Sequence, residues 1–576
     1  MFEGPEIRVW RAMFFNVANP LIVQGDGTLL LEVQNARYEE ARDFLARFAE
    51  LEKSPEHMHT YRITPLSLWN AAAAGLGADD IVAGLADLTK YELPPNVGDD
   101  IREKIGRFGK VVLLQGPPDD DGTQTLLLQA HDDAVARQIA STPKVYKETA
   151  GAVKEGLFRV PLANRGTIKQ ALLRIGYPVD DRAGFVQGAA LDVQMRQQCV
   201  SGGPFHLRRY QRLAVDAWHK DGTWEGGHGV VVLPCGAGKT IVGIATMAAT
   251  TCQTLILATG VSAVRQWIDE ILDKTELTPD QVGEYSGASK QIRPVTVTTY
   301  QILTHRPSKE APFTHLGLFT ANDWGLIVYD EVHLLPAPVF RITADIQARR
   351  RLGLTATLVR EDGREGDVFS LIGPKRYDVP WRELERKGFV AEARCIEVRL
   401  PLPGELLVKY ELAEKRAQGR IAAENPWKMQ VIADLLARHT DDKILIIGMY
   451  LAQLEEAARR FGAPLITGKT RNEERDRLYE QFRQGEIRVL TVSKVANFSI
   501  NLPDANVAIQ ISGTFGSRQE EAQRLGRILR PSGGDAYFYS VVTRSSREQE
   551  FAHNRQLFLT EQGYSYAIEE WEPPEE

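Results

Sequence analysis

The sequence predicts an α/β protein with two parallel-sheet domains in tandem and smaller α+β domains before them. From Phe205, short apolar runs alternate with helical segments, as in a doubly wound α/β domain. A second alternating series begins after Trp381. With 576 residues, the chain is too long to fold around a single hydrophobic core. Its content of 43% hydrophobic and 25% charged residues is typical of folded globular domains.

Five segments are expected along the chain. In order they are a helix-rich accessory domain, a second small domain, two sheet domains and a C-terminal tail, over residues 1–100, 101–198, 199–375, 376–545 and 546–576. In the first segment, a hairpin precedes a helix that is expected to run from Tyr38 to Leu51. In the second, Arg165, Lys169 and Arg174 lie along a predicted helix, where they either contact phosphates or form a solvated basic face.

A phosphate-binding loop is predicted where a strand meets a helix. The apolar run Val230 to Leu233 is typical of a buried parallel strand, and an Ala-rich helix follows the loop. Two glycines let backbone N–H groups surround a polyphosphate at a helix N-terminus. Lys239 is expected to reach the β- and γ-phosphates, and the Thr240 hydroxyl to bind Mg²⁺. The predicted ATP-binding residues of this loop are Pro234, Cys235, Gly236, Ala237, Gly238, Lys239 and Thr240.

This motif is imperfect, because Leu233 stands where the strict pattern has glycine. A Gly-rich turn also connects strands to helices without any ligand. The phosphate-loop interpretation is favoured because Lys239 and Thr240 occupy the two positions that the chemistry requires, after a strand and before a helix.

A second candidate element is an apolar strand, Leu326 to Tyr329, that delivers Asp330 and Glu331. Mg²⁺ needs a carboxylate at the end of a strand beside the phosphate loop, so Asp330 is assigned to the metal. The next acid can orient or deprotonate the attacking water, so Glu331 is the predicted base. His333 is expected to couple the site to the neighbouring domain, with a surface histidine as the alternative.

Polar residues before and after these elements are expected to complete the site. Gln211 lies upstream of the loop, and its amide can both donate and accept on the edge of adenine. Arg208 lies beside it and is also assigned to ATP binding. Thr355 and Thr357 follow another strand, and their hydroxyls are expected to couple the acidic strand end to what packs above it.

An Arg-rich segment in the second sheet domain predicts arginine fingers. On a helix, Arg527 and Arg530 are three residues apart and share a face. Guanidinium groups delivered to a γ-phosphate raise the rate of nucleotide hydrolysis about 10³- to 10⁵-fold in other enzymes. Gln523 of the same helix is assigned to coupling. Taken alone, such a helix is usually just solvated, but its place in the second of two tandem domains favours the functional interpretation.

Composition limits the partners. The net charge of -7 excludes a protein that is basic all over, so nucleic acid must be held by a local stripe. That stripe is predicted on a helix of the insertion at about 404–425, which belongs to neither sheet and carries Lys409, Lys415, Arg416 and Arg420.

The chain shows no sign of a membrane or secreted protein. Its four cysteines lack zinc or disulfide spacing. No run approaches the roughly 18 apolar residues of a membrane span, and the first residues lack a secretion signal. A cytoplasmic protein without a membrane partner is expected.

Together these motifs resemble superfamily-two helicases, specifically the XPB branch of DNA repair helicases. The resemblance is most specific from Leu207 onward. The matching stretches are Leu207–Gln211, Leu233–Thr240, Asp330–His333, Leu352–Asp362, Ser493–Val495, Leu502–Pro503, Ala505–Val507, Gly516–Arg530 and Tyr537–Tyr566. After Val495 the chain departs from the eukaryotic pattern at residues 496–498 and at Asn501.

The resemblance implies a motor that uses ATP and Mg²⁺, acts on duplex or forked DNA with 3′-to-5′ polarity, and serves nucleotide excision repair. It implies two RecA-like domains, a damage-recognition-like domain over 101–198 and a helical thumb at about 404–425. Arg360, Glu361 and Asp362 look like the RED motif, which is implicated in opening duplex DNA. A prokaryotic form is expected, as a monomer, with a nuclease as a candidate partner by resemblance to archaeal relatives.

Two other functions stay open on the residues alone. An RNA helicase is one, because a motor core that tracks phosphates does not by itself distinguish sugars. An ATP-switched clamp or adaptor that binds nucleic acid without travelling is the other. Nucleic-acid-stimulated ATP hydrolysis and strand displacement separate these alternatives from a DNA motor.

Overall fold

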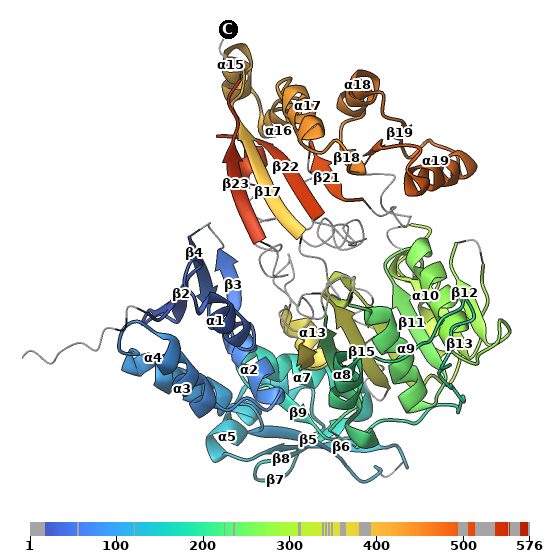
Figure 1. Ribbon diagram of the computed structural model, residues 1–576. Helices are drawn as coiled ribbons and strands as arrows, with labels where there is room; N and C mark the ends of the chain where they lie inside the picture. The colour runs from blue at the N-terminus through green and yellow to red at the C-terminus, as the bar shows by residue number, and fades with distance from the viewer. Residues whose placement is uncertain are drawn as a thin grey trace, which may run out of the picture. The chain divides into compact units, whose positions relative to one another are not determined.

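We describe the protein from a computed structural model, which divides into two compact units, Met1–Phe108 and Gly109–Glu576 (Figure 1). The structure describes residues 16, 18–53, 57–119, 121–223, 225–233, 237–287, 289–308, 311, 313–336, 339, 343, 346, 349–356, 365–378, 393–493, 505–512, 536–550, 552 and 565–573. No helix among these residues has both the length and the apolar character that crossing a bilayer requires.

The first unit is an antiparallel four-stranded sheet with four helices. The strand order is β1-β2-β4-β3. Its elements are β1 (Leu21–Val23), β2 (Thr28–Glu32), α1 (Tyr38–Leu45), β3 (Glu50–Lys53), β4 (Met58–Arg62), α2 (Pro65–Ala73), α3 (Ala78–Leu88) and α4 (Pro95–Ile105). The helix expected to reach Leu51 ends at Leu45, because Leu51 pairs with Tyr61 in the sheet. Leu51, which continues the helical spacing of apolar residues, is therefore a buried residue of strand β3.

Residues 111–181 form a five-stranded mixed sheet of order β7-β8-β6-β5-β9. Its elements are β5 (Val111–Gln115), β6 (Thr125–Ala130), α5 (Asp133–Ser141), α6 (Pro143–Tyr146), β7 (Ala152–Lys154), β8 (Leu157–Pro161), α7 (Arg165–Arg174) and β9 (Val179–Asp181). Arg165 and Lys169 were expected either to contact phosphates or to form a solvated basic face, and both expectations are wrong. Each is buried and bonds Asp181, with N–O distances of 2.8 and 2.9 Å.

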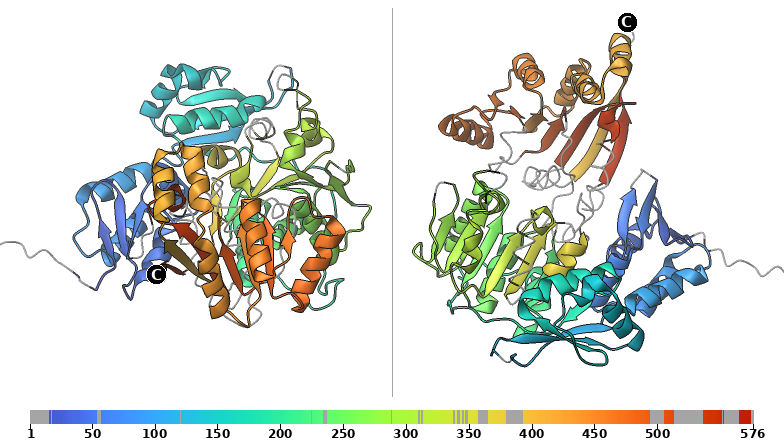
Figure 2. Two further views of the ribbon diagram at one scale, coloured as in Figure 1. Left: turned by 90° about the horizontal axis from the view of Figure 1, so that it is seen from above. Right: turned by 180° about the vertical axis from the view of Figure 1, so that it is seen from behind.

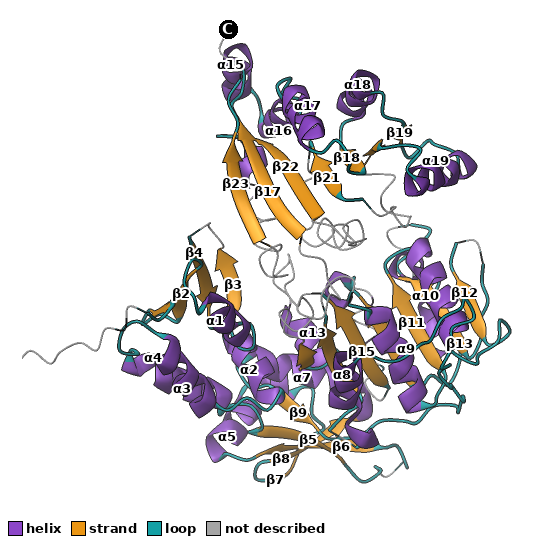
Figure 3. Cartoon of the chain, in the orientation of Figure 1, coloured by secondary structure: helices purple, strands orange, loops and turns teal. Residues whose placement is uncertain are grey.

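The first parallel sheet has seven strands in the order β12-β13-β11-β14-β15-β10-β16 (Figure 3). Its strands are β10 (His228–Val232), β11 (Thr254–Ala258), β12 (Val282–Tyr285), β13 (Val295–Thr299), β14 (Leu326–Asp330), β15 (Arg350–Thr355) and β16 (Lys375–Asp378). The connecting helices are α8 (Arg209–His219), α9 (Lys239–Thr250), α10 (Val261–Lys274), α11 (Tyr300–Leu303) and α13 (Glu365–Leu371).

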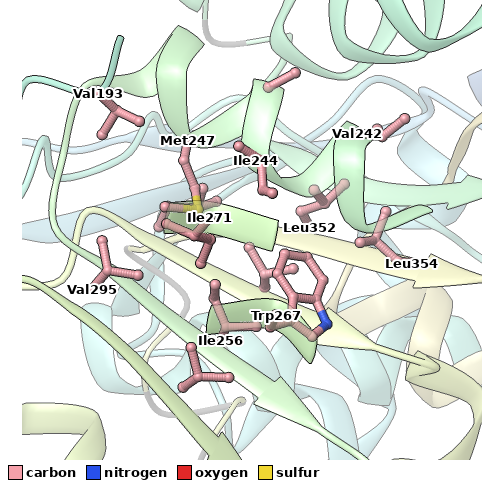
Figure 4. Close-up of a cluster of buried hydrophobic side chains, with 14 of the residues drawn as sticks. Val193, Val242, Ile244, Met247, Ile256, Trp267, Ile271, Val295, Leu352 and Leu354 are labelled. Carbon is pink, nitrogen blue, oxygen red and sulfur yellow. The ribbon is translucent and has the colours of Figure 1, made fainter. Parts of the chain in front are cut away.

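Both faces of this sheet are covered. Ile256 and Leu354 point into a core that includes residues of α8, α9 and α10, among them Trp267 (Figure 4). Leu255 and Tyr329 point the other way, into a core shared with α11 and α13. A parallel sheet is stable when helices bury both faces, which explains why its strands are nearly continuous apolar runs.

The second parallel sheet also has seven strands, in the order β19-β20-β18-β21-β22-β17-β23. Its strands are β17 (Ala393–Leu400), β18 (Ile444–Gly448), β19 (Leu465–Ile466), β20 (Val489–Ser493), β21 (Val507–Gln510), β22 (Ala536–Thr543) and β23 (Ser565–Glu570). Its helices are α15 (Gly404–Leu412), α16 (Lys415–Ala423), α17 (Lys428–Arg438), α18 (Leu451–Phe461) and α19 (Asn472–Gln484).

The predicted fold class is therefore confirmed: two tandem parallel-sheet domains follow smaller α+β domains, and a helical insertion interrupts the second. Sequence patterns indicated five strands of the second sheet and missed two. These are β17, which pairs with β22, and β23, which pairs with the other side of β17 (Figures 1 and 2). Strand β23 comes from the expected C-terminal tail, so this part of the tail completes the sheet.

Candidate nucleotide-binding site

The predicted phosphate loop lies between β10 and α9. Gly238 precedes the first turn of α9 with φ of 79°, and Lys239 and Thr240 are the first residues of the helix. A Cβ at position 238 would lie 2.5 Å from Nε2 of Gln211, so glycine is needed there for both conformation and space. The helix N-terminus that favours anions is thus in the place that the sequence predicted.

The segment before α8 holds the end of this loop. Tyr210 donates its hydroxyl to the carbonyl oxygen of Ala237 at 2.7 Å, and the Gln211 amide donates to the same oxygen at 3.2 Å. The Gln211 side-chain oxygen accepts from the Arg208 backbone N–H at 3.0 Å. Gln211, assigned to adenine, therefore also joins α8 to the phosphate loop. The sequence pattern does not distinguish Tyr210 as a site residue, because an aromatic ring at this spacing is also typical of a helix core.

The two acids at the end of β14 lie beside the loop. The Lys239 ammonium is 3.2 Å from one carboxylate oxygen of Glu331, and both side chains are at most 12% exposed. The other Glu331 oxygen, Oε2, is buried and has no hydrogen-bond partner among the described residues. Glu331 also has φ of 49°, a left-handed conformation that residues with a side chain adopt at an energetic cost. A buried, unsatisfied acceptor on a strained residue is typical of a reactive site.

His333 joins this acid to the next strand. Its Nδ1 is 2.6 Å from the Thr355 hydroxyl and 3.7 Å from Oε2 of Glu331. Both His333 and Thr355 are buried, so the alternative of a surface histidine is wrong. Thr355 ends β15 and pairs with Val232 of β10 in the sheet register. The structure thus brings the predicted residues Lys239, Glu331, His333 and Thr355 together.

Two aromatic residues outside the predicted site, Tyr300 and Trp267, hold Asp330. Tyr300 donates its hydroxyl to the Asp330 carbonyl oxygen at 2.8 Å. Trp267 donates its indole N–H to the Asp330 carboxylate at 3.0 Å. In the sequence, Tyr300 and Trp267 are marked only by the polar residues that follow the neighbouring strands β13 and β11. Those signals do not specify an aromatic donor.

The donor set fits Mg²⁺ with nucleotide. Thr240 carries a hydroxyl oxygen and Asp330 carboxylate oxygens, the kind of donor that this hard cation prefers. No group of three or more His, Cys, Asp or Glu residues that could hold a metal occurs in the part of the chain that the structure describes. Mg²⁺ in phosphate-transfer sites takes few protein ligands and completes its shell with phosphates and water, so such a cage is not required.

Other predicted site residues lie outside the described residues. These are Pro234, Cys235, Gly236, Thr357, Arg360, Glu361, Asp362, Gln523, Arg527 and Arg530.

The insertion is helical, but it consists of two helices where one was expected. The first, α15, ends at Leu412, and α16 begins at Lys415. Lys409 and Lys415 are exposed, whereas the Arg420 guanidinium bonds Glu424 at 3.0 Å. The side chain of Arg416 lies outside the described residues.

The fold and the site together define a phosphate-loop motor with two tandem RecA-like domains. Residues 384–572 match the family described as ERCC3/RAD25/XPB C-terminal helicase. Residues 204–360 match the type III restriction enzyme res subunit family, and residues 21–151 match a family described as helicase conserved C-terminal domain.

Three relatives extend the match over nearly the whole chain. The chain is 51% identical over 551 residues to a protein of Mycobacterium tuberculosis named DNA 3'-5' helicase XPB, covering 95% of this chain and 97% of the relative. A Kineococcus radiotolerans protein of the same name is also 51% identical over 551 residues, covering 95% and 96%. The general transcription and DNA repair factor IIH helicase/translocase subunit XPB of Encephalitozoon cuniculi is 34% identical over 570 residues, covering 96% and 83%. The chain belongs to the XPB family of DNA helicases.

Proposed function

We propose that the protein is an ATP-dependent 3′-to-5′ DNA helicase or double-stranded DNA translocase that acts in nucleotide excision repair. The single observation that carries this proposal is the ion pair between Lys239 and Glu331, which joins a phosphate-binding helix to a strand-end acid. Membership of the XPB family supports DNA as the nucleic acid. A cytoplasmic monomer that works with a nuclease is part of the same proposal.

In this proposal Lys239 changes partner during the cycle. A triphosphate at the N-terminus of α9 competes with Glu331 for the ammonium group. The freed Glu331 carboxylate then accepts a proton from the attacking water. Thr240 and Asp330 would hold Mg²⁺, and the bound ion would supply charge neutralisation for the phosphates. Releasing a buried ion pair only when phosphate arrives links water activation to nucleotide binding.

The remaining site residues have proposed roles that the resemblance supplies. Arg527 and Arg530 act as arginine fingers. His333, Thr355, Thr357 and Gln523 couple hydrolysis to movement. Nucleotide contacts come from Arg208, Gln211 and the phosphate loop, and DNA contacts from Arg360, Glu361, Asp362, Lys409, Lys415, Arg416 and Arg420.

The test compares ATP hydrolysis and strand displacement in the wild-type protein and a Lys239→Ala variant. We expect the variant to lose DNA-stimulated hydrolysis, while Lys144→Ala, an exposed lysine on α6, retains it. Unchanged turnover in Lys239→Ala would contradict the assignment. Forked duplexes with a single 3′ or 5′ tail test polarity.

The same assay separates the alternatives. Equal stimulation by RNA and DNA of matched length would favour an RNA helicase. ATP-dependent binding without displacement of a fork or a triplex-forming strand would favour a clamp.

A further inference from the structure

Trp267 makes a polar contact that the other buried tryptophans of this domain do not make. It lies on α10, is 1% exposed, and donates its indole N–H to Oδ2 of Asp330 at 3.0 Å. Trp218 and Trp324 are also buried, but their indoles donate to backbone carbonyl oxygens of Arg351 and Leu318. Only the Trp267 contact reaches a carboxylate at the carboxyl edge of the sheet, among the described residues.

The surrounding helices fix the Trp267 ring. On α9, position 243 is glycine, and a Cβ there would lie 2.4 Å from Cη2 of the indole and 3.3 Å from Leu354. Helix α9 therefore leaves space for the ring where a side chain would otherwise project. Figure 4 shows Trp267 packed in the core with Leu354 and Leu352 beside it. Because packing holds the ring, its N–H is a preorganised donor.

A fixed donor restricts the Asp330 carboxylate. One oxygen accepts a charge-assisted hydrogen bond, which sets the torsion of the side chain. The Tyr300 hydroxyl holds the backbone carbonyl of the same residue. Asp330 is therefore constrained through both its backbone and its side chain. Partners of this kind orient metal-binding groups and commonly change metal affinity or activity about 10- to 100-fold when removed.

We propose that Trp267 is a positioning residue that holds Asp330 for Mg²⁺, and that it thereby sets the Mg²⁺ requirement of nucleotide binding. This inference rests on the proposed function, because it takes Asp330 as a metal ligand. Trp267 itself touches neither nucleotide nor metal in this scheme. Its effect passes through the carboxylate alone.

The test is a Mg²⁺ titration of fluorescent ADP binding to the full chain. Trp267→Phe keeps most of the ring and removes the N–H donor. We expect the Mg²⁺ concentration at half-maximal binding to rise about 10-fold or more, while ADP affinity in EDTA stays unchanged. ATP hydrolysis by the variant should recover as Mg²⁺ is raised. A structural role alone would instead weaken ADP binding equally with and without the metal.

Trp324→Phe is the matched control, because it removes an indole donor that bonds only a backbone carbonyl among the described contacts. We expect its Mg²⁺ midpoint to equal that of the wild-type protein. Benzothienylalanine at position 267 keeps the ring shape without the N–H, so it tests the same idea if the phenylalanine variant fails to fold. A midpoint within twofold of wild type in the folded variant would overturn the role of Trp267. If Mg²⁺ did not strengthen ADP binding to the wild-type protein, the proposed function itself would fall.

Discussion

Glu331 combines backbone strain, burial and an unsatisfied oxygen in one residue. Its φ of 49° places the carboxylate against Lys239, and Oε2 is buried with no hydrogen-bond partner among the described residues. A strained residue persists only where its surroundings hold it, and such residues cluster at functional sites. The motif Asp-Glu indicated Asp330 and Glu331 as candidate site residues, but it did not indicate that Glu331 would pair with Lys239.

Replacement of Glu331 with Gln tests its role as the base. The amide is close in shape but cannot accept the proton from water, so we expect ATP hydrolysis to fall about 10²- to 10⁴-fold. Binding of Mg·ADP should persist, as measured by isothermal titration calorimetry. Glu276→Gln, which alters an exposed acid paired with Arg196, should hydrolyse ATP normally. Hydrolysis by Glu331→Gln at more than a tenth of the wild-type rate would contradict the assignment.

At the scale of single elements, α9 is shaped by its neighbour. Glycine normally weakens a helix interior by about 1 kcal/mol relative to alanine. At position 243 it is nevertheless the residue that fits, because the Trp267 ring occupies the space of a side chain. The packing of two helices therefore outweighs local helix propensity here.

Gly243→Ala should reveal this competition. Overpacking typically costs about 1–3 kcal/mol, which exceeds the gain in propensity, so we expect the free energy of unfolding to fall. The displaced indole should also raise the Mg²⁺ midpoint for ADP binding. Differential scanning calorimetry and the metal titration measure the two effects. Gly287→Ala, where a Cβ meets no heavy atom within 4 Å, should change neither.

The insertion helices α15 and α16 carry exposed cations whose proposed partner is the DNA backbone. Lys409 and Lys415 are exposed, and Lys415 is in the first turn of α16. Arg438 on α17 offers a contrast, because it bonds Glu569 at 2.9 Å. Charge on a helix surface is often only solvated, so a salt-dependent measurement is needed.

The double variant Lys409→Ala/Lys415→Ala should weaken DNA binding for all sequences alike. Each lost phosphate contact lowers the slope of log affinity against log salt by about 1. Fluorescence anisotropy over a range of salt concentrations measures that slope. Arg438→Ala should leave it unchanged. A wild-type slope in the double variant would show that these lysines do not contact phosphates.

At the scale of the whole molecule, buried charge links the parts of the second unit. Burial alone would raise the pKa of Asp181, but Arg165 and Lys169 hold it well below its usual value. The Arg351 guanidinium of β15 lies 5.5 Å from the ring centroid of Phe185, and the Arg165 guanidinium lies 5.2 Å from the same centroid. The Gln170 amide of α7 donates to Asp367 of α13 at 2.8 Å. Removing one member of such a network leaves uncompensated charge, which costs about 3–5 kcal/mol.

His228, at the start of β10, should make this unit sensitive to acid. Burial and the Arg376 guanidinium lower its pKa well below 6.5, while Asp181 raises it and Arg351 and Lys169 lower it further. The unfolded chain then binds more protons than the folded one below pH 6.5, so stability falls as pH falls. Calorimetry at pH 7 and pH 5 measures the loss of stability between the two pH values. We expect this loss to be smaller for His228→Gln than for the wild-type protein.

His206 is exposed and provides the control for this measurement. His206→Gln should lose as much stability between pH 7 and pH 5 as the wild-type protein does. An unaltered difference in His228→Gln would mean that other groups bind the protons. His59 contributes separately in the first unit, where burial and Arg42 lower its pKa to about 4.

The sequence by itself determined the fold class and most of the strands of both motor sheets, because a parallel strand covered on both faces is a short apolar run. It also placed the phosphate loop and the two acids, because each motif is contiguous. It missed β17 and β23 of the second sheet and misjudged the end of the helix after Tyr38. Strands β23 and β3 are short and lie at a sheet edge, where the periodic signal of the sequence is weak.

Only the tertiary structure decided which distant side chains meet. The order β14-β15-β10 brings Glu331 to Lys239 and His333 to Thr355. Trp267 reaches Asp330 across 63 residues of sequence, through a space that a glycine on another helix provides. Hydrogen bonds and ion pairs act over a few ångströms in space, and local sequence patterns carry no information about that distance.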